Sequence, residues 1–173
     1  MKTRRRHSAF TLVEVLLSLA LTCLLLASVA AAIKSSLFSY AENEDISDAM
    51  QVARSILHNM GNEVRVGDTL ASASHQLTIN YIGRADLLQQ VQYDYDGNSL
   101  WYRRTVNGAQ ASYSLIDPND TVRIRSFDVI RELGYDPNGV SFTKSVTTRL
   151  ALRVGNKDFA VTASADPRRN QSY

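Results

Sequence analysis

Residues 10–33 read FTLVEVLLSLALTCLLLASVAAAI, and this stretch has Glu14 as its only charged residue. A helix of this length spans roughly 36 Å, whereas the hydrocarbon core of a bilayer is about 30 Å thick. The stretch therefore predicts a transmembrane helix. Basic residues cluster before it, within residues 2–6, and acidic residues follow it within residues 42–48. The positive-inside rule then puts the N-terminus in the cytoplasm and residues 34–173 outside.

The overall composition is that of a folded protein with an anchor. The chain has 173 residues, 45% of them hydrophobic and 21% charged, which excludes a wholly disordered or collagen-like chain. One cysteine excludes an internal disulfide, and three histidines leave little material for a metal site. Four of the 19 Lys and Arg residues lie in the first six positions, so the remainder has a slight acidic excess. The net charge of +2 therefore gives no support to general nucleic-acid binding.

Two other kinds of N-terminal signal share features with this segment. A secretory signal peptide is the main alternative, because small residues within 28–32 would suit a signal peptidase. The apolar stretch is long for such a signal, and Glu14 near its start is unexpected. A lipoprotein signal at Cys23 is disfavoured, because Thr22 is not the usual small residue before it and a further apolar run follows. We expect Cys23 to be a small apolar residue of the helix.

Glu14 needs a physical reason. An ionised carboxylate within an apolar helix costs about 2.5–3.5 kcal/mol on insertion scales, so such a residue is usually paired or functional. The alternative is that Glu14 lies near the cytoplasmic end and reaches the headgroups. Taken alone, the residue leaves both explanations open.

The surrounding residues favour a functional role. Residues 4–9 (RRRHSA) followed by residues 10–16 (FTLVEVL) resemble the class III signal of type IV prepilins and type II secretion pseudopilins. That signal joins a basic leader, a small residue before the cut, an aromatic first mature residue and glutamate as the fifth. The resemblance implies cleavage between Ala9 and Phe10 and N-methylation of Phe10. Ala9 stands where the family favours glycine.

The same resemblance implies an assembly mechanism and a set of partners. Glu14 would pair with the N-terminal amine of Phe10 on the adjacent subunit, which would set the axial register of a filament. The implied partners are a prepilin peptidase, other minor and major pilins or pseudopilins, an inner-membrane assembly platform and membrane lipid. The implied location is the inner membrane, crossed once, with the C-terminal head in the periplasm.

The helix is expected to continue beyond the membrane through residues 34–66. No proline precedes Pro118, and apolar residues recur every three or four positions, which is typical of one helical face. These residues are Ile46, Ala49, Met50, Ala53, Leu57, Met60 and Val64. The glycines at positions 61 and 67 are expected to weaken or end the helix.

From residue 75 the hydrophobic pattern alternates, which predicts a β-rich head over residues 75–165. Six or seven short antiparallel strands are expected, with turns at Asp96-Gly97-Asn98, Asn107-Gly108 and Gly155-Asn156. Residues 134–139 are expected to form a loop, and residues 166–173 a polar tail. The predicted segments are 76–82, 88–95, 100–106, 111–116, 122–129, 146–154 and 159–164.

The expected fold is therefore α+β: a long N-terminal helix, transmembrane in residues 10–33 and then amphipathic, packed on an antiparallel β-sheet head. Residues 1–9 are expected to be the leader. This order agrees with pilin-like proteins. Residues 93–104 and the closing hairpin are similar, more loosely, to J-type pseudopilins and W-type minor pilins.

Other chemistry finds little support in the sequence. No nucleophile, zinc-protease, dinucleotide or phosphate-loop motif is present, so we expect no enzyme and no cofactor. Asp94, Asp96 and Asn98 resemble part of a calcium loop, but they lack the distal glutamate and suit a turn better. Asp117 and Asp120 are interpreted in the same way. We therefore expect no metal site.

An aromatic and basic set could form a nucleic-acid surface, although cross-strand packing is preferred and no nucleic-acid partner is expected. The set comprises Tyr93, Tyr95, Trp101, Tyr102, Arg103 and Arg104.

The sequence therefore favours a structural subunit, a minor pilin or pseudopilin at the tip region of a periplasmic filament that serves type II secretion or a type IV pilus. The alternative is a membrane-anchored extracytoplasmic binding domain, with DNA as one ligand in a competence-type pilus. The mature N-terminus distinguishes the two.

Overall fold

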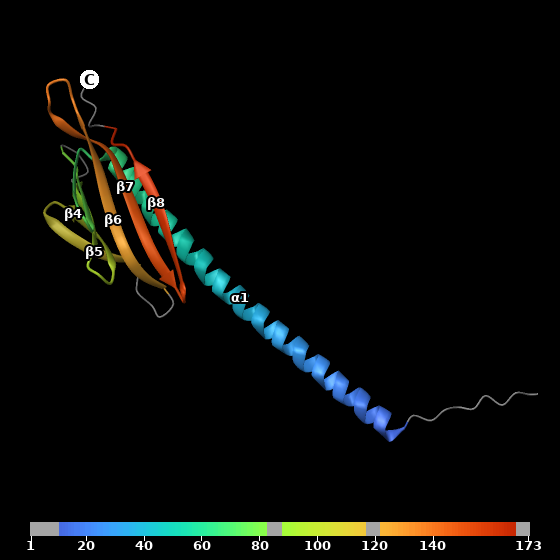
Figure 1. The fold of residues 1–173 in the computed structure, drawn as a ribbon. Coiled ribbons are helices and arrows are strands. Elements are labelled where there is room, and N and C mark those ends of the chain that lie inside the picture. Colours follow the sequence, from blue (N-terminus) through green and yellow to red (C-terminus); the bar gives the residue numbers. More distant parts are fainter. Residues whose placement is uncertain (1–10, 83–87, 117–121, 169–173) are drawn as a thin grey trace, which may run out of the picture. The chain divides into compact units, whose positions relative to one another are not determined.

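The computed structural model describes residues 11–82, 88–116 and 122–168. The chain divides into two compact units, Met1–Asn43 and Glu44–Tyr173. Helix α1 (Leu12–Val66) begins in the first unit and ends in the second, and the described strands all follow it (Figure 1). The predicted α+β class, with one long N-terminal helix followed by antiparallel sheets, is confirmed.

The second unit holds two antiparallel sheets. The five-stranded sheet has the order β1-β2-β3-β4-β5, and the three-stranded sheet has the order β6-β7-β8. The first sheet contains β1 (Thr69–Ala73), β2 (Gln76–Asn80), β3 (Leu88–Tyr95), β4 (Leu100–Val106) and β5 (Ala109–Ile116). The second contains β6 (Val122–Tyr135), β7 (Ser141–Val154) and β8 (Lys157–Ala165). Every strand pairs with its sequence neighbour within its sheet, as in a meander.

The C-terminal part of α1 supplies one wall of the core. Its buried residues are Ala49, Ala53, Ile56, Leu57, Met60 and Val64. All of these except Ala49 meet the inward side chains of both sheets in one cluster. The predicted apolar face is thus confirmed at most positions, while Ile46 and Met50 are only half-buried. Ile56 joins this face because a helical stripe is wider than a strict three-to-four spacing. Gly67 N–H donates to the carbonyl of Glu63 (2.9 Å) and closes the last turn.

A bulge explains how β6 buries residues three positions apart. In its pairing with β7, Ile124 faces Leu152 and Ser126 faces Ala151, so Arg125 has no partner in the register. Side chains of a strand normally alternate between faces, and one extra residue shifts that alternation. Ile124 and Phe127 therefore both point into the core.

The predicted tight turns occur where turn chemistry indicated them. Asn107 has a φ of 50° and Gly108 one of 76°, the left-handed conformation required for a two-residue hairpin turn. Gly155 has a φ of 54° in the turn between β7 and β8. These positions favour Asn and Gly because other side chains clash there.

Three details of the prediction were wrong. The head contains β1, which was not predicted, so the described strands number eight and exceed the expected six or seven. Residues 134–135 belong to β6, and β7 begins at Ser141, well before the predicted position 146. Gly134 is also not a turn residue. A Cβ there would lie 2.6 Å from Cζ of Phe142, so glycine is needed for close approach across the β6–β7 pair.

The turn between β1 and β2 connects the two sheets. The carbonyl of Ser74 accepts the N–H of Val129 in β6 (3.3 Å), and that of His75 accepts the N–H of Tyr95 in β3 (3.0 Å). The Arg131 guanidinium donates to the carbonyl of Leu70 (2.6 Å). The bonds of Ser74 with Val129 and of Leu70 with Arg131 therefore join the two sheets.

Candidate functional site

The described part of the first unit is mainly an apolar helix with exposed side chains. Residues 12–40 of α1 are exposed throughout, including Leu12, Leu24 and Leu26. Among the described residues, α1 is the helix with the length and apolar composition to cross a membrane. An apolar surface of this extent is unfavourable in water, so lipid or other helices must cover it.

Several hydroxyl side chains within this stretch have partners inside the helix. The hydroxyl of Ser18 donates to the carbonyl of Val15 (2.9 Å), and that of Thr22 donates to the carbonyl of Ser18 (2.8 Å). Ser28 donates in the same way to Leu25 (2.8 Å). Such bonds to the preceding turn let small polar residues lie in an apolar environment without another partner.

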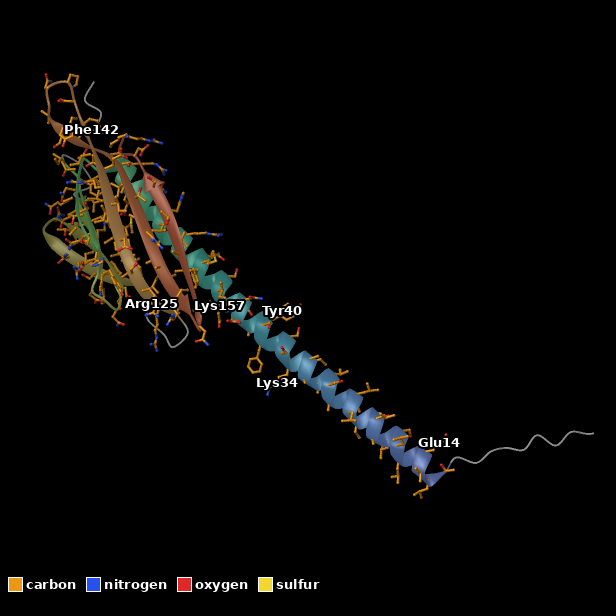
Figure 2. All side chains as sticks on the ribbon, in the orientation of Figure 1. Glu14, Lys34, Tyr40, Arg125, Phe142 and Lys157 are labelled. Carbon is orange, nitrogen blue, oxygen red and sulfur yellow. The ribbon has the colours of Figure 1, made fainter. Side chains whose placement is uncertain are left out.

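Glu14 differs from those residues. It lies in the first turn of α1, where its backbone N–H donates to Oγ1 of Thr11 (3.3 Å) and to the carbonyl of Thr11 (3.0 Å) (Figure 2). Thr11 and Glu14 have the Thr-x-x-Glu spacing of a capping box, a signal that the sequence interpretation missed. The Glu14 carboxylate makes no hydrogen bond or ion pair with any described residue. Ala9 and Phe10, the predicted cleavage and methylation residues, lie outside the described residues.

The other end of the apolar stretch carries a cation and aromatic residues. Lys34 Nζ lies 5.9 Å from the ring centre of Phe38, and Tyr40 is exposed two residues further on (Figure 2). Lysine and aromatic residues of this kind are enriched where a helix meets the membrane surface.

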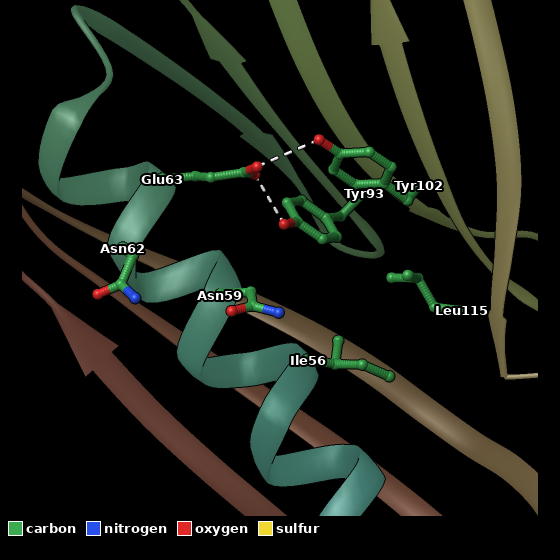
Figure 3. A pocket seen from close by; sticks show the side chains of 7 residues that line it. All are labelled: Ile56, Asn59, Asn62, Glu63, Tyr93, Tyr102 and Leu115. Atoms are coloured by element: carbon green, nitrogen blue, oxygen red, sulfur yellow. Dashed lines mark hydrogen bonds between the residues drawn. The ribbon is translucent and has the colours of Figure 1, made fainter.

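The second unit contains a pocket between α1 and the five-stranded sheet. Its volume is about 390 Å³, which lies within the range of small-molecule sites. Figure 3 shows α1 on one side of this pocket and the tyrosines of β3 and β4 on the other. The lining residues are Ile56, Asn59, Asn62, Glu63, Tyr93, Tyr102 and Leu115.

Glu63 is the charged centre of the pocket. Its carboxylate accepts the hydroxyl of Tyr93 (2.7 Å) at one oxygen and that of Tyr102 (3.2 Å) at the other (Figure 3). The two rings are 5.3 Å apart in an edge-to-face arrangement. Because Tyr93 belongs to β3 and Tyr102 to β4, Glu63 connects the helix to both strands.

Burial dominates the electrostatics of this group. Desolvation raises the pKa of Glu63, although the two tyrosine hydroxyls and the charge of Arg104 act in the opposite direction. Burial and the neighbouring carboxylate raise the pKa of Tyr102 to about 12. Burial, followed by the charge of Glu63, also raises the pKa of Tyr93 above its ordinary value. Both tyrosines therefore keep their protons at neutral pH and remain donors.

The candidate calcium residues have turn and strand roles. Oδ1 of Asp96 accepts the N–H groups of Asn98 (2.9 Å) and Ser99 (2.8 Å), and Oδ2 accepts the indole N–H of Trp101 (2.8 Å). Asp94 pairs with Arg103 at 2.7 Å. In the part of the chain that the structure describes, no three His, Cys, Asp or Glu residues are grouped to hold a metal. Asp117 and Asp120 lie outside the described residues.

The aromatic and basic residues do not form one surface. Tyr93 and Tyr102 face α1 through Glu63, whereas Trp101 and Arg103 alternate with Tyr102 on β4 and bond Asp96 and Asp94. The hydroxyl of Tyr95 lies within hydrogen-bond distance of the carbonyls of Gly97 (2.9 Å) and Ile124 (3.2 Å). These contacts favour the cross-strand packing interpretation.

Comparison with known proteins found one match. Residues 4–30 match the family model described as the prokaryotic N-terminal methylation motif. The match spans most of the basic leader, Phe10, Glu14 and nearly all of the apolar stretch. No curated protein and no solved structure matches the chain.

Proposed function

We propose that this chain is a minor pilin or pseudopilin. The premise is its class III prepilin signal, which makes it a type IV pilin-like protein. It would be a structural subunit that initiates a short periplasmic filament or forms its tip region, for type II secretion or a type IV pilus. The observation that carries the proposal is the methylation motif at residues 4–30, in register with the exposed apolar part of α1. The motif implies processing by a prepilin peptidase and assembly with other pilins.

In this proposal each part of the chain has one task. Residues 1–9 are the leader, residues 10–33 the membrane and assembly segment, and residues 34–66 the helix that enters the head. The head, residues 69–165, lies outside the inner membrane, and residues 166–173 form its tail. The concentration of Lys and Arg in the leader supports this orientation, because positive residues favour the cytoplasmic side.

Cleavage between Ala9 and Phe10 would remove the basic leader and create an α-amino group on Phe10. That amine would be methylated and would pair with Glu14 of a neighbouring subunit. The pairing is supported by the position of Glu14, which lies on an exposed apolar helix and has no partner among the described residues. A charge in a low-dielectric helix bundle is stabilised by an opposite charge. The presence of Glu14 also favours a subunit with a neighbour to dock against, which is not necessarily the extreme tip.

The test is the mature N-terminus. The full chain is purified from its native host and from a host that lacks the prepilin peptidase, and both are analysed by intact-mass and terminal-peptide mass spectrometry. We expect N-methyl-phenylalanine at residue 10 in the first host and the full leader in the second. An intact Met1 in both hosts, or a start near Ala31, would contradict the proposal and favour a membrane-anchored binding domain.

A further inference from the structure

The pocket between α1 and the five-stranded sheet combines a carboxylate with an apolar wall. Glu63 provides the carboxylate, while Ile56 and Leu115 line the pocket beside the two tyrosine rings (Figure 3). Nothing in filament assembly through the N-terminal helix requires such a pocket. We propose that it binds an alkylammonium group, the chemistry shared by a lysine side chain and a small free amine.

The first argument is that the Glu63 carboxylate can accept further hydrogen bonds. An ionised carboxylate has about four acceptor positions, and the hydroxyls of Tyr93 and Tyr102 use one on each oxygen. No Lys or Arg nitrogen lies within ion-pair distance of Glu63 among the described residues. Arg104 acts on the carboxylate only through its longer-range charge. A cation that enters the pocket therefore meets a half-buried charge with open lone pairs.

The second argument concerns the shape of that cation. A guanidinium prefers to bind a carboxylate with two parallel hydrogen bonds, which requires both oxygens on the same edge. Here each oxygen already accepts a tyrosine hydroxyl, so the two-pronged arrangement requires the remaining position of both oxygens to point to the same edge. An ammonium group is a compact point charge with three donors and needs only one open position on each acceptor.

The remaining walls suit the rest of the ligand. The edge-to-face rings of Tyr93 and Tyr102 can contact a cation through the face of a ring, an interaction that acts within about 6 Å of the ring centre. Ile56 and Leu115 can cover an alkyl stem. Asn59 also lines the pocket, and its amide oxygen can accept a further ammonium N–H. In contrast, the Asn62 amide already bonds His58 and Arg65 along the helix.

The experiment titrates the full chain, purified in detergent micelles and labelled with ¹³C on its tyrosine rings. The probe is n-butylammonium chloride at neutral pH, and n-butanol is its uncharged counterpart of similar size. We expect saturable shifts of the Tyr93 and Tyr102 signals with n-butylammonium only. Shifts that do not saturate, or equal shifts with n-butanol, would overturn the proposal, because partition into micelles and apolar contact would then explain them.

Two variants test the site from different sides. Glu63→Gln removes the charge and should weaken n-butylammonium binding about tenfold or more. Leu115→Trp fills the apolar side of the pocket, leaves Glu63 in place, and should weaken binding similarly. Glu132→Gln is the matched control, because Glu132 is an exposed carboxylate paired with Lys144 on the other sheet. If Glu63→Gln and Leu115→Trp both bind as well as the control, the assignment is wrong.

The source of the amine is identified in native membranes. A carbodiimide couples a carboxylate to a lysine amine that touches it, forming an amide while the reagent takes up the water. A cross-linked peptide that joins Glu63 to a lysine of another pilin, absent in Glu63→Gln, identifies a partner side chain. Amine binding without such a peptide identifies a free amine, and absence of both overturns the proposal.

Discussion

The connection between α1 and the sheet can be measured through Tyr93. Tyr93→Phe removes the shorter hydrogen bond to Glu63 (2.7 Å) and leaves the longer one from Tyr102 (3.2 Å). A hydrogen bond to a charged group contributes about 1.5–3 kcal/mol to stability, against about 0.5–1.5 kcal/mol for an ordinary one. Because Tyr93 is 2% exposed, its hydroxyl is well shielded from bulk solvent, and we expect the upper range.

The second tyrosine provides an internal comparison. Tyr102 is only half-buried and its bond is longer, so Tyr102→Phe should lower the free energy of unfolding by about 0.5–1.5 kcal/mol. Tyr135→Phe is the control, because Tyr135 is 70% exposed and should change stability by less than about 0.5 kcal/mol. The order of destabilisation should be Tyr93, then Tyr102, then Tyr135.

The assay is urea unfolding of the full chain in detergent micelles, followed by the fluorescence of Trp101, the only tryptophan. The two Tyr→Phe changes are repeated in a Glu63→Gln background. Most of the effect of Tyr93→Phe should disappear there, since its charged acceptor is gone, which gives a coupling free energy of about 1 kcal/mol or more. An equal effect in both backgrounds, or a larger effect of Tyr102→Phe, would refute the reasoning.

Four further outcomes are expected. The Glu14→Leu variant should insert and lose its leader normally, but it should co-purify less with filament partners, because breaking a buried pair costs about 3–5 kcal/mol. Association at the wild-type level would contradict the pairing and indicate that the Glu14 carboxylate reaches the lipid headgroups instead. Leader cleavage, followed by immunoblotting, should be retained in Ala9→Gly and blocked in Ala9→Leu, and equal cleavage would contradict the assigned site. Leu57→Ala should lower the free energy of unfolding by about 2–5 kcal/mol in a urea titration, since Leu57 is 1% exposed, while Val52→Ala, at 46% exposed, should change it little. The folded head holds the Glu63 proton more tightly than the unfolded chain, so this residue's contribution to stability should be full below pH 4.5 and should fall as pH rises through its raised pKa. Glu63→Gln should remove that fall in urea titrations across pH. A difference in unfolding free energy between wild type and Glu63→Gln that does not change with pH would contradict it.

The helix and most of the hairpins were predictable because their signals are local. The apolar run and the three-to-four spacing lie within α1, and Asn107-Gly108 supplies the left-handed residues that its turn requires. In each case the determining interaction joins residues a few positions apart. A short stretch of sequence therefore contains both the signal for each helix or hairpin and the residues whose interaction produces it.

The parts that were missed depend on distant residues. β1 consists mainly of Thr, Ser and Ala, and only Leu70 within it is buried. Its strand conformation comes from pairing with β2 and from the Ser74 contact with β6. Gly134 likewise suggested a turn, but its reason is the ring of Phe142 on the next strand. Local propensity cannot indicate such a partner.

The same distinction separates the two candidate sites. Glu14 was identified because its meaning lies in an adjacent pattern, the basic leader and the apolar run. Glu63 was missed because its partners, Tyr93 and Tyr102, lie 30 and 39 positions away. The available signal was a lone acidic residue in the last turns of an amphipathic helix, next to the apolar face at Met60 and Val64. That signal also fits an ordinary solvent-exposed residue.

The polar residues of the apolar segment indicate where assembly specificity resides. Ser18, Thr22 and Ser28 donate hydrogen bonds to carbonyls of their own helix, so they need no hydrogen-bond partner on a neighbouring subunit. Apolar contacts give affinity, but they are non-directional and leave a helix free to slide along its neighbour. Among the described residues from Leu12 to Ile33, Glu14 alone carries a charge. A single buried charge specifies register because every slipped arrangement leaves it unpaired, as with polar residues in coiled coils. In the proposed filament, the apolar residues would therefore set how strongly the subunits associate, and Glu14 would set the register.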